Sequence, residues 1–186
     1  MKDGEHTKKL FVHSCCGPCL YASFSHLPRS DFRLASFYNP NIEPPNEWFS
    51  RAQSFLDVCE LLCVNGEVVP HSISSELHEA LFSKRCSFCY DLRLTESAYA
   101  ARQRGFDTFT TTLLSSPTQN QILLREKLAA IESEFGMQVY YFEVPREEYM
   151  KKTRELKNMG IYVQNYCGCY GSLLEREAER FKALWR

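Results

Sequence analysis

The fold of this 186-residue chain can be predicted from one segment, Lys9-Leu10-Phe11-Val12-His13-Ser14-Cys15-Cys16-Gly17-Pro18-Cys19. Residues 9–13 form a short apolar run, which predicts a buried β-strand. A cysteine-rich turn follows, and Pro18 suits the first turn of a helix predicted over residues 21–27. Nucleotide-binding α/β proteins place a glycine-rich phosphate loop at this point of the chain. The turn is therefore expected at the edge of the sheet where such folds bind ligands.

Short β-rich runs alternate with helical patterns along the rest of the chain. Four further strands are predicted, over residues 32–38, 67–71, 106–114 and 137–143. A long helix is predicted between the N-cap Asn46 and Gly66, and others over residues 75–83, 91–104, 119–135, 146–159 and 170–184. Strands separated by helices predict an α/β fold, with a mostly parallel sheet of five strands covered on both faces. The length predicts a single domain over residues 1–186.

The near-zero net charge of the chain excludes a strong electrostatic field around the whole molecule. It carries 22 basic and 23 acidic side chains, a formal net charge of −1. A polyanionic partner would therefore need a local basic patch. The polar residues 1–9 and the short apolar run after them do not match a signal peptide or a membrane span. We therefore expect a cytoplasmic protein with no membrane partner.

Seven of the nine cysteines fall in three tight clusters. The clusters are Cys15-Cys16-Gly17-Pro18-Cys19, Cys86-Ser87-Phe88-Cys89 and Cys167-Gly168-Cys169. In a reducing cytoplasm such clusters favour metal binding or catalysis over disulfides. Side chains of the neighbours Cys15 and Cys16 are expected to diverge. They then either ligate two different centres, or one is a ligand and the other a redox thiol. Cys59 and Cys63, on the apolar side of the long helix, are expected to pack in the core.

Three kinds of thiol site compete for these clusters. A structural Zn(Cys)₄ site needs only two C-x-x-C pairs and leaves three of the seven thiols unexplained. A purely thiol-based redox enzyme needs two or three cysteines. An iron–sulfur site uses three or four thiolates, and the remaining thiols then hold a second metal or take part in the chemistry. The iron–sulfur interpretation accounts for most of the cysteines. Which thiol binds which centre stays open, as does a redox role for Cys167 and Cys169.

Polar residues near the clusters are candidates for catalysis and binding. Asp91 is either an iron ligand or proton donor, or a carboxylate that stabilises the start of a helix. Tyr90 is a second candidate proton donor, and Arg93 is a candidate for binding phosphate. Polar residues that follow predicted strands are expected to face the same pocket. They are Asn39, Asn41, Ser115 and Ser116. A basic run of Lys151, Lys152, Arg154 and Lys157 is either a solvated helix face or a contact for an RNA backbone.

Five blocks of the sequence together resemble the QueH-type epoxyqueuosine reductases. They are Cys15-Cys16-Gly17-Pro18-Cys19, Tyr38-Asn39-Pro40-Asn41-Ile42, Cys86-Ser87-Phe88-Cys89-Tyr90-Asp91-Leu92-Arg93-Leu94, Phe109-Thr110-Thr111-Thr112-Leu113-Leu114 and Asn165-Tyr166-Cys167-Gly168-Cys169. The resemblance implies a Rossmann-like, HUP-type three-layer sandwich that holds a [4Fe-4S] cluster and an adjacent second iron. It also implies that the seven clustered cysteines are the metal ligands.

The implied activity is the reduction of epoxyqueuosine to queuosine at the wobble position of tRNA. The substrate partner would then be tRNA that contains epoxyqueuosine, and an external electron donor would be required. One alternative enzyme class is tRNA thiolation on a similar fold, which predicts a glycine- and serine-rich phosphate loop where this chain has Cys-Cys-Gly-Pro-Cys. A zinc-stabilised RNA-binding module is the alternative without catalysis.

Overall fold

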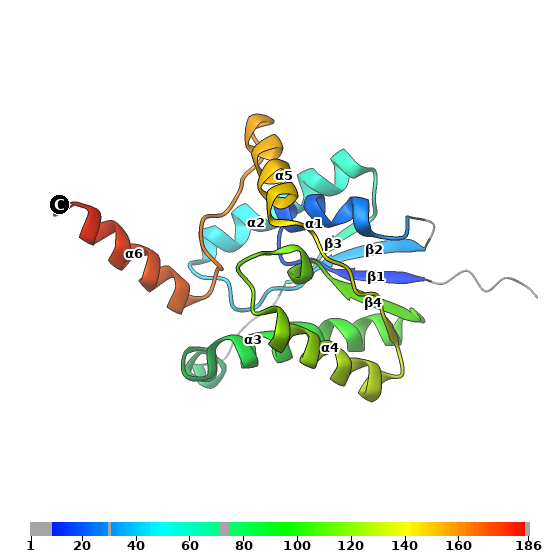
Figure 1. Cartoon of the computed structure of the whole chain (residues 1–186). Helices are drawn as coiled ribbons and strands as arrows, with labels where there is room; N and C mark the ends of the chain where they lie inside the picture. The colour runs from blue at the N-terminus through cyan, green and yellow to red at the C-terminus, as the bar shows by residue number, and fades with distance from the viewer. Residues whose placement is uncertain (1–8, 30, 71–74, 185–186) are drawn as a thin grey trace, which may run out of the picture.

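The computed structural model describes residues 9–29, 31–70 and 75–184 (Figure 1). Its strands form one sheet in the order β3-β2-β1-β4-β5, and all four pairings between neighbours are parallel. The strands are β1 (Leu10–His13), β2 (Phe32–Phe37), β3 (Gly66–Val68), β4 (Thr108–Thr111) and β5 (Gln138–Val139). The predicted α/β class with a five-stranded sheet is confirmed, and the sheet is parallel throughout these five strands.

Helices cover both faces of the sheet, which completes the three layers. In Figure 1, α1 (Gly17–Ser23), α2 (Pro45–Leu62) and α5 (Arg146–Asn158) lie above the strands, and α3 (Ser75–Gln103) and α4 (Gln121–Phe135) lie below them. Helix α6 (Tyr170–Leu184) extends away from the sheet. None of the helices in the described ranges combines the length and hydropathy that a membrane span requires.

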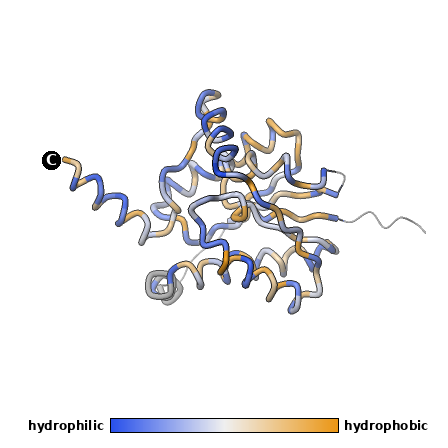
Figure 2. Tube along the Cα trace, viewed as in Figure 1, coloured by the Kyte–Doolittle hydropathy of each residue, from blue (hydrophilic) through white to orange (hydrophobic). Residues whose placement is uncertain are grey.

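The core lies around β1, the central strand. Leu10, Phe11 and Val12 are fully buried because helices pack on both faces of this strand. Phe11 stacks on Phe109 of β4 with ring centroids 6.1 Å apart. Figure 2 shows this concentration of hydrophobic residues along the strands. The sheet therefore forms a rigid base for the loops at its carboxyl edge.

The chain changes sides of the sheet between β3 and β4. Strands β2 and β3 lie on one side of β1, whereas β4 and β5 lie on the other. In parallel α/β sheets a crevice opens at this switch point, beyond the carboxyl ends of the strands. The turn after β1 and the turn after β4 (η2, Thr112–Ser115) both lie there.

Several element boundaries differ from those predicted. Helix α1 begins at Gly17 rather than at residue 21, because Cys16 acts as its N-cap and Pro18 occupies the first turn. Helix α2 begins at Pro45 and ends before Cys63, whose left-handed φ of 53° stops the helix. Gly66 does not end this helix but begins β3.

The strands at the switch point are shorter than predicted. Strand β4 stops at Thr111, whose side chain caps the 3₁₀ turn η2, and the predicted strand to residue 114 is wrong at that end. Strand β5 contains only Gln138 and Val139. The predicted end of the third strand, His71, lies outside the described residues. Helix α4 begins at Gln121, two residues later than predicted, because Asn120 is its N-cap.

Candidate metal centre

The turn after β1 gathers three thiols, Cys15, Cys16 and Cys19, which we call the first thiol group. All three are buried, and their Sγ atoms lie within 4.8 Å of one another. The Sγ atoms of Cys15 and Cys16 are 3.8 Å apart, so the prediction that these neighbours diverge is wrong. Their sulfurs converge because the Cys16 side chain turns back over α1 and accepts a hydrogen bond from the backbone N–H of Cys19.

Gly17 lets this turn pass close to α2. A Cβ at Gly17 would lie 2.6 Å from the Oγ of Ser54 and would also overlap the backbone carbonyl of that residue. No side chain fits there without moving α1 away from α2. Because Cys16 precedes α1 and Cys19 lies in it, the spacing of the first thiol group depends on this glycine.

Hydrogen bonds favour a thiolate at Cys16. Burial alone would raise its pKa, but hydrogen bonds from Cys15 and Cys19 and the charge of Arg51 hold this pKa well below its ordinary value. Gln164 adds a donor, with Nε2 2.8 Å from the Cys16 Sγ. Thiolates are the form that binds metal. Three buried sulfurs within 4.8 Å, one of them stabilised as a thiolate, fit the donor set of a metal or an iron–sulfur cluster.

The other clustered cysteines form a second thiol group, made of Cys86, Cys89, Cys167 and Cys169. Helix α3 bends at Arg85, where φ is 46° and ψ is −125°, and Cys86 and Cys89 lie in the first turn after the bend. Their spacing of three residues places them on the same side of this helical segment. Cys86 is exposed, whereas Cys89 is buried and accepts a hydrogen bond of 3.0 Å from Asn41 Nδ2.

Cys167 and Cys169 reach the second group from the loop before α6. Cys169 immediately precedes that helix, and its sulfur accepts a hydrogen bond of 3.4 Å from the backbone N–H of Ser172. A hydrogen bond from Cys167, helped by those from Ser172, lowers the pKa of Cys169 to about 5, against the effect of burial. The charges of Cys169 and Cys86 also act on the buried Cys89. The thiols of α3 and of this loop therefore interact electrostatically.

Arg51 of α2 holds the loop that carries Cys167 and Gly168. Its guanidinium donates to the carbonyl oxygens of Cys167 (2.8 Å) and Tyr166 (3.0 Å) and pairs with Glu47 at 2.7 Å. Gly168 has φ +115°, and a Cβ there would lie 2.8 Å from Arg51 Nη1. The glycine therefore satisfies both the backbone conformation and the close approach of the guanidinium.

Arg93 of α3 lies between the two thiol groups. It is 2% exposed, and its Nε donates a hydrogen bond of 2.6 Å to Asn41 Oδ1. Burial disfavours its charge, yet the charges of Cys89, Cys167, Cys15 and Cys169 raise its pKa above the ordinary value. Its Nη2 has no hydrogen-bond partner among the described residues. A buried cationic donor without a partner is unusual and is suited to an anionic or oxygen-bearing ligand.

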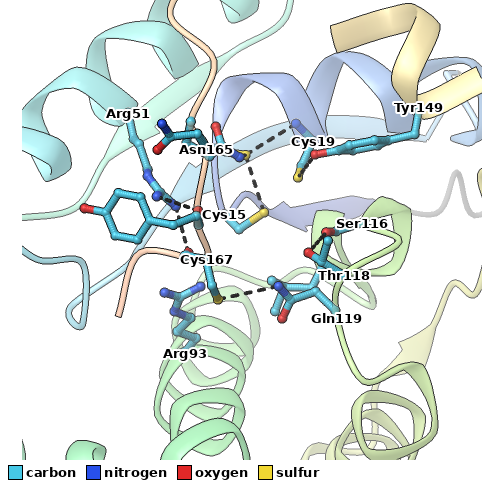
Figure 3. A pocket seen from close by; sticks show the side chains of 14 residues that line it. Cys15, Cys19, Arg51, Arg93, Ser116, Thr118, Gln119, Tyr149, Asn165 and Cys167 are labelled. Carbon is cyan, nitrogen blue, oxygen red and sulfur yellow. Dashed lines mark hydrogen bonds between the residues drawn. The ribbon is translucent and has the colours of Figure 1, made fainter. Parts of the chain in front are cut away.

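A cavity of about 320 Å³ opens between these groups (Figure 3). Its wall includes the whole first thiol group, Cys167 and the guanidinium groups of Arg51 and Arg93. The remaining lining residues are Leu113, Ser116, Thr118, Gln119, Tyr149, Gln164, Asn165 and Tyr166. The site thus combines thiols from both ends of the chain with two buried cations, in a space large enough for part of a nucleotide.

Comparisons with known proteins assign the chain to a family. The profile of the family described as "Epoxyqueuosine reductase QueH" matches residues 10–175. The chain belongs to this family. A relative from Thermotoga maritima with the same description is 34% identical over 180 residues, which are 90% of this chain and 91% of the relative. A QueH from Dehalococcoides mccartyi is 29% identical and is covered to 94%.

Among solved structures, the fold resembles that of a tRNA-modifying protein. The chain matches the U34-tRNA thiolase NcsA from Methanococcus maripaludis, solved with its [4Fe-4S] cluster, with a TM-score of 0.57 and 10% identity. The match covers 87% of this chain and 60% of the thiolase. At this identity the likeness shows the fold alone, whereas the assignment to QueH rests on the sequence.

In this member of the QueH family the predicted catalytic residues, Asp91 and Tyr90, are not among the residues that line the cavity. Asp91 is half-exposed and forms an ion pair with Lys127 of α4 at 2.7 Å. Tyr90 is buried; its hydroxyl donates to Gln119 Oε1 and accepts from the backbone N–H of Asn120. Tyr90 therefore orients Gln119, whose Nε2 faces the Cys167 sulfur at 3.6 Å. The proton-donor role of Asp91 and Tyr90 stays a prediction.

Only two of the five predicted substrate-binding residues line the cavity. Ser116 lines the cavity, as does Arg93. Ser115 is turned inward and donates hydrogen bonds to the carbonyl oxygens of Thr112 and Cys19. Asn39 donates to the carbonyl oxygen of Ser14, and both ends of the Asn41 amide are bonded to protein groups. Substrate contacts by these residues stay predictions.

The sequence did not single out Arg51 and Gln164. Both line the cavity, Arg51 from α2 and Gln164 from the loop before α6. Neither lies in a recognisable motif, and both contact thiol-bearing segments more than 100 positions away in sequence. Outside the two thiol groups, Cys59 is buried in the core as expected, but Cys63 is exposed at the end of α2. Its left-handed backbone at the helix C-terminus turns the side chain to the surface.

Proposed function

We propose that this chain reduces epoxyqueuosine to queuosine at the wobble position of tRNA, the activity that gives its family its name. The reaction breaks both bonds from carbon to the epoxide oxygen and forms an alkene. It consumes two electrons and two protons and releases water. The observation that carries the proposal is the convergence of thiols from two distant segments, the first thiol group and Cys167, around one cavity. The Nη2 of Arg93, which has no partner among the described residues, lies beside them.

The residues present fit an iron–sulfur site. We propose that the seven clustered cysteines are the ligands of a [4Fe-4S] cluster and of a second iron beside it. When bound, such a cluster supplies electrons one at a time, and an iron with an open position acts as a Lewis acid. In support, the first thiol group supplies three sulfurs and the second supplies four, more than a single tetrahedral ion uses.

The polar residues of the cavity would bind and orient the substrate. Arg93 Nη2 would donate to an oxygen of the modified nucleoside, because this buried donor has no protein partner. Ser116 and Gln119, in the segment before α4, line the cavity and would contact hydroxyl groups of the ribose or of the cyclopentane ring. The departing oxygen needs a proton, for which Asp91 and Tyr90 are the proposed donors; Asp91 would first have to leave its ion pair with Lys127.

A tRNA loop is the form of substrate that this cavity suits. A base in a duplex would be out of reach, whereas an unstacked loop nucleotide can enter a pocket. We propose that the protein works in the cytoplasm with an external electron donor. All nine cysteines are free thiols, which agrees with a reducing compartment.

Thiolation of tRNA is the alternative that the fold likeness favours. A thiolase that uses ATP would need room for phosphate after the first strand. In this chain the turn after β1 is filled by three buried thiols instead of a glycine-rich loop. The presence of thiols where a thiolase would bind phosphate supports the reductase function over thiolation.

The test is an anaerobic assay of the full chain after reconstitution with iron and sulfide. Dithionite supplies electrons, the substrate is tRNA that carries epoxyqueuosine, and the digested nucleosides are analysed by mass spectrometry. We expect epoxyqueuosine to lose one oxygen and become queuosine without ATP. Unchanged epoxyqueuosine with an iron-loaded protein would contradict the proposal, and the gain of sulfur in the presence of ATP would favour thiolation.

A further inference from the structure

The outer face of α5 carries three cations that have no partner among the residues that the structure describes. Lys151, Arg154 and Lys157 recur every third residue, and all three are exposed. They form no ion pair or hydrogen bond within the part of the chain that the structure describes. The spacing places them along one side of the helix, over a rise of about 9 Å.

Some exposed cations on other helices are paired with carboxylates. Arg85 pairs with Glu175, and Arg125 pairs with Glu143. On α5 itself, Lys152 is 3.5 Å from Glu155. The helix has five basic and three acidic side chains, a net charge of +2 on a chain whose net charge is −1. Figure 2 shows α5 as mainly hydrophilic. The outer face of α5 is therefore a local concentration of positive charge.

The inner face of the same helix forms part of the cavity wall. Tyr149 lines the cavity, and its hydroxyl lies 3.5 Å from the Cys19 sulfur. Thr153 and Leu156, on the same side of the helix, are buried. Lys151 and Arg154 lie on the far side of the helix and Lys157 lies on its flank, so one helix separates the thiol site from a basic surface. A strand that inserts one nucleotide into the cavity has flanking phosphates that must continue over the rim, and α5 is part of that rim.

We propose that Lys151, Arg154 and Lys157 are the docking surface for the sugar–phosphate backbone of the tRNA loop whose nucleotide enters the cavity. This inference rests on the proposed function, because it takes the substrate to be an RNA loop. The contacts are to phosphate and position the strand without reading its sequence. Three neutralised phosphates release counterions, which makes binding salt-dependent despite the near-zero net charge of the chain.

The experiment measures tRNA affinity at several salt concentrations for the reconstituted full chain. In the test variant Lys151, Arg154 and Lys157 are all replaced by Gln. The control replaces Lys9, Arg102 and Lys182 by Gln, because these are also exposed cations whose side chains have no ion pair among the described residues. We expect the test variant to bind about tenfold more weakly at low salt. The slope of log K against log salt should become shallower by about 2 to 3.

Other measurements separate docking from folding and chemistry. The test variant should keep its iron content and its turnover number at saturating tRNA, while its KM for tRNA rises in proportion to the dissociation constant. The control variant should match wild type in affinity and slope. Unchanged affinity and slope in the test variant would overturn the inference and indicate a solvated helix face.

Failure of the proposed function would give a different pattern. If wild type binds tRNA through α5 but leaves epoxyqueuosine intact, the docking surface stands and the reductase proposal fails. If wild type reduces the substrate and the test variant binds tRNA normally, the docking surface fails alone. Normal tRNA binding combined with slower reduction by a protein electron donor would also overturn the inference, because the face would then serve an acidic redox partner.

Discussion

Gly168 separates Cys167 from Cys169 and combines a left-handed backbone with a crowded environment. Its φ is +115°, and an added Cβ would lie 2.8 Å from Arg51 Nη1. Gly160 also has a positive φ, of 78°, but open space around it. We expect Gly168→Ala to lower the free energy of unfolding by about 2–4 kcal/mol, through strain and overlap together. Gly160→Ala should cost about 1 kcal/mol, through strain alone.

Thermal unfolding of the metal-free proteins measures this difference, and iron content after reconstitution gives a second readout. The Gly168→Ala variant should also bind less iron, because the loop that carries two thiols must move. Equal stability losses in the two variants would show that Arg51 does not restrain the loop.

Arg93 offers the second test at this scale. We expect Arg93→Met to lower turnover about 100-fold, the usual cost of removing one donor to a developing negative oxygen. Iron content should stay close to wild type, since Arg93 is not a ligand. Arg93→Lys is the matched control that keeps the charge but loses the Nε bond to Asn41. Full activity in Arg93→Met, or a loss of iron as large as the loss of activity, would contradict a substrate-binding role.

Residue types were easier to predict than their partners. The seven clustered cysteines and Arg93 are visible in the sequence because spacing and chemistry single them out. The ion pair of Asp91 with Lys127 is not, because it depends on how α3 packs against α4. The role of Arg51 could not be predicted for the same reason. Its contacts to Cys167 and Tyr166 exist only after the last loop folds back onto α2.

At the scale of helices and strands, the N-terminal ends of three helices position residues of the site. Cys16 caps α1, and the sulfur of Cys169 accepts from the first turn of α6 in the same way. Asn120 caps α4, accepting from the backbone N–H of Leu123 at 3.1 Å, and Gln119 directly precedes this cap. A helix whose first N–H groups point at a sulfur favours the thiolate. The elements therefore help to set the charge of the ligands as well as their positions.

Removal of the α4 cap tests this organisation. Asn120→Ala should cost about 1 kcal/mol, which for a chain of this size lowers the thermal midpoint by about 2–4 °C. Asn120→Asp keeps the capping oxygen and should be close to wild type. Asn158→Ala, an exposed change at the end of α5, should also have little effect. Equal midpoints for Asn120→Ala and Asn158→Ala would mean that the cap does not stabilise α4.

Periodicity predicted the long elements well and their ends less well. The apolar faces of α2 and α4 were visible because they repeat over many residues. The early start of α1 was missed because a cysteine is not an ordinary N-cap, and its capping depends on the sulfur facing the helix. The short β4 was missed because Thr residues favour strands by propensity, whereas Thr111 here caps a 3₁₀ turn.

At the scale of the whole molecule, topology brings the thiols together. The parallel order with β1 at the centre places the first thiol group at the switch point of the sheet. Helix α3 and the loop before α6 then deliver the other four from residues far along the chain. The alternation of strands and helices predicted this edge as the site. It could not predict the division into two thiol groups, which depends on the bend at Arg85 and on Arg51.

Iron and sulfide content after anaerobic reconstitution shows whether both thiol groups hold iron at this site. Wild type, Cys16→Ala, Cys89→Ala and the exposed Cys63→Ala control should be compared together with their absorption spectra. Assignment of iron to both thiol groups predicts that Cys16→Ala and Cys89→Ala each lose iron and visible absorption, whereas Cys63→Ala matches wild type. Wild-type iron content in both Cys16→Ala and Cys89→Ala, or zinc in place of iron in the wild-type protein, would contradict it.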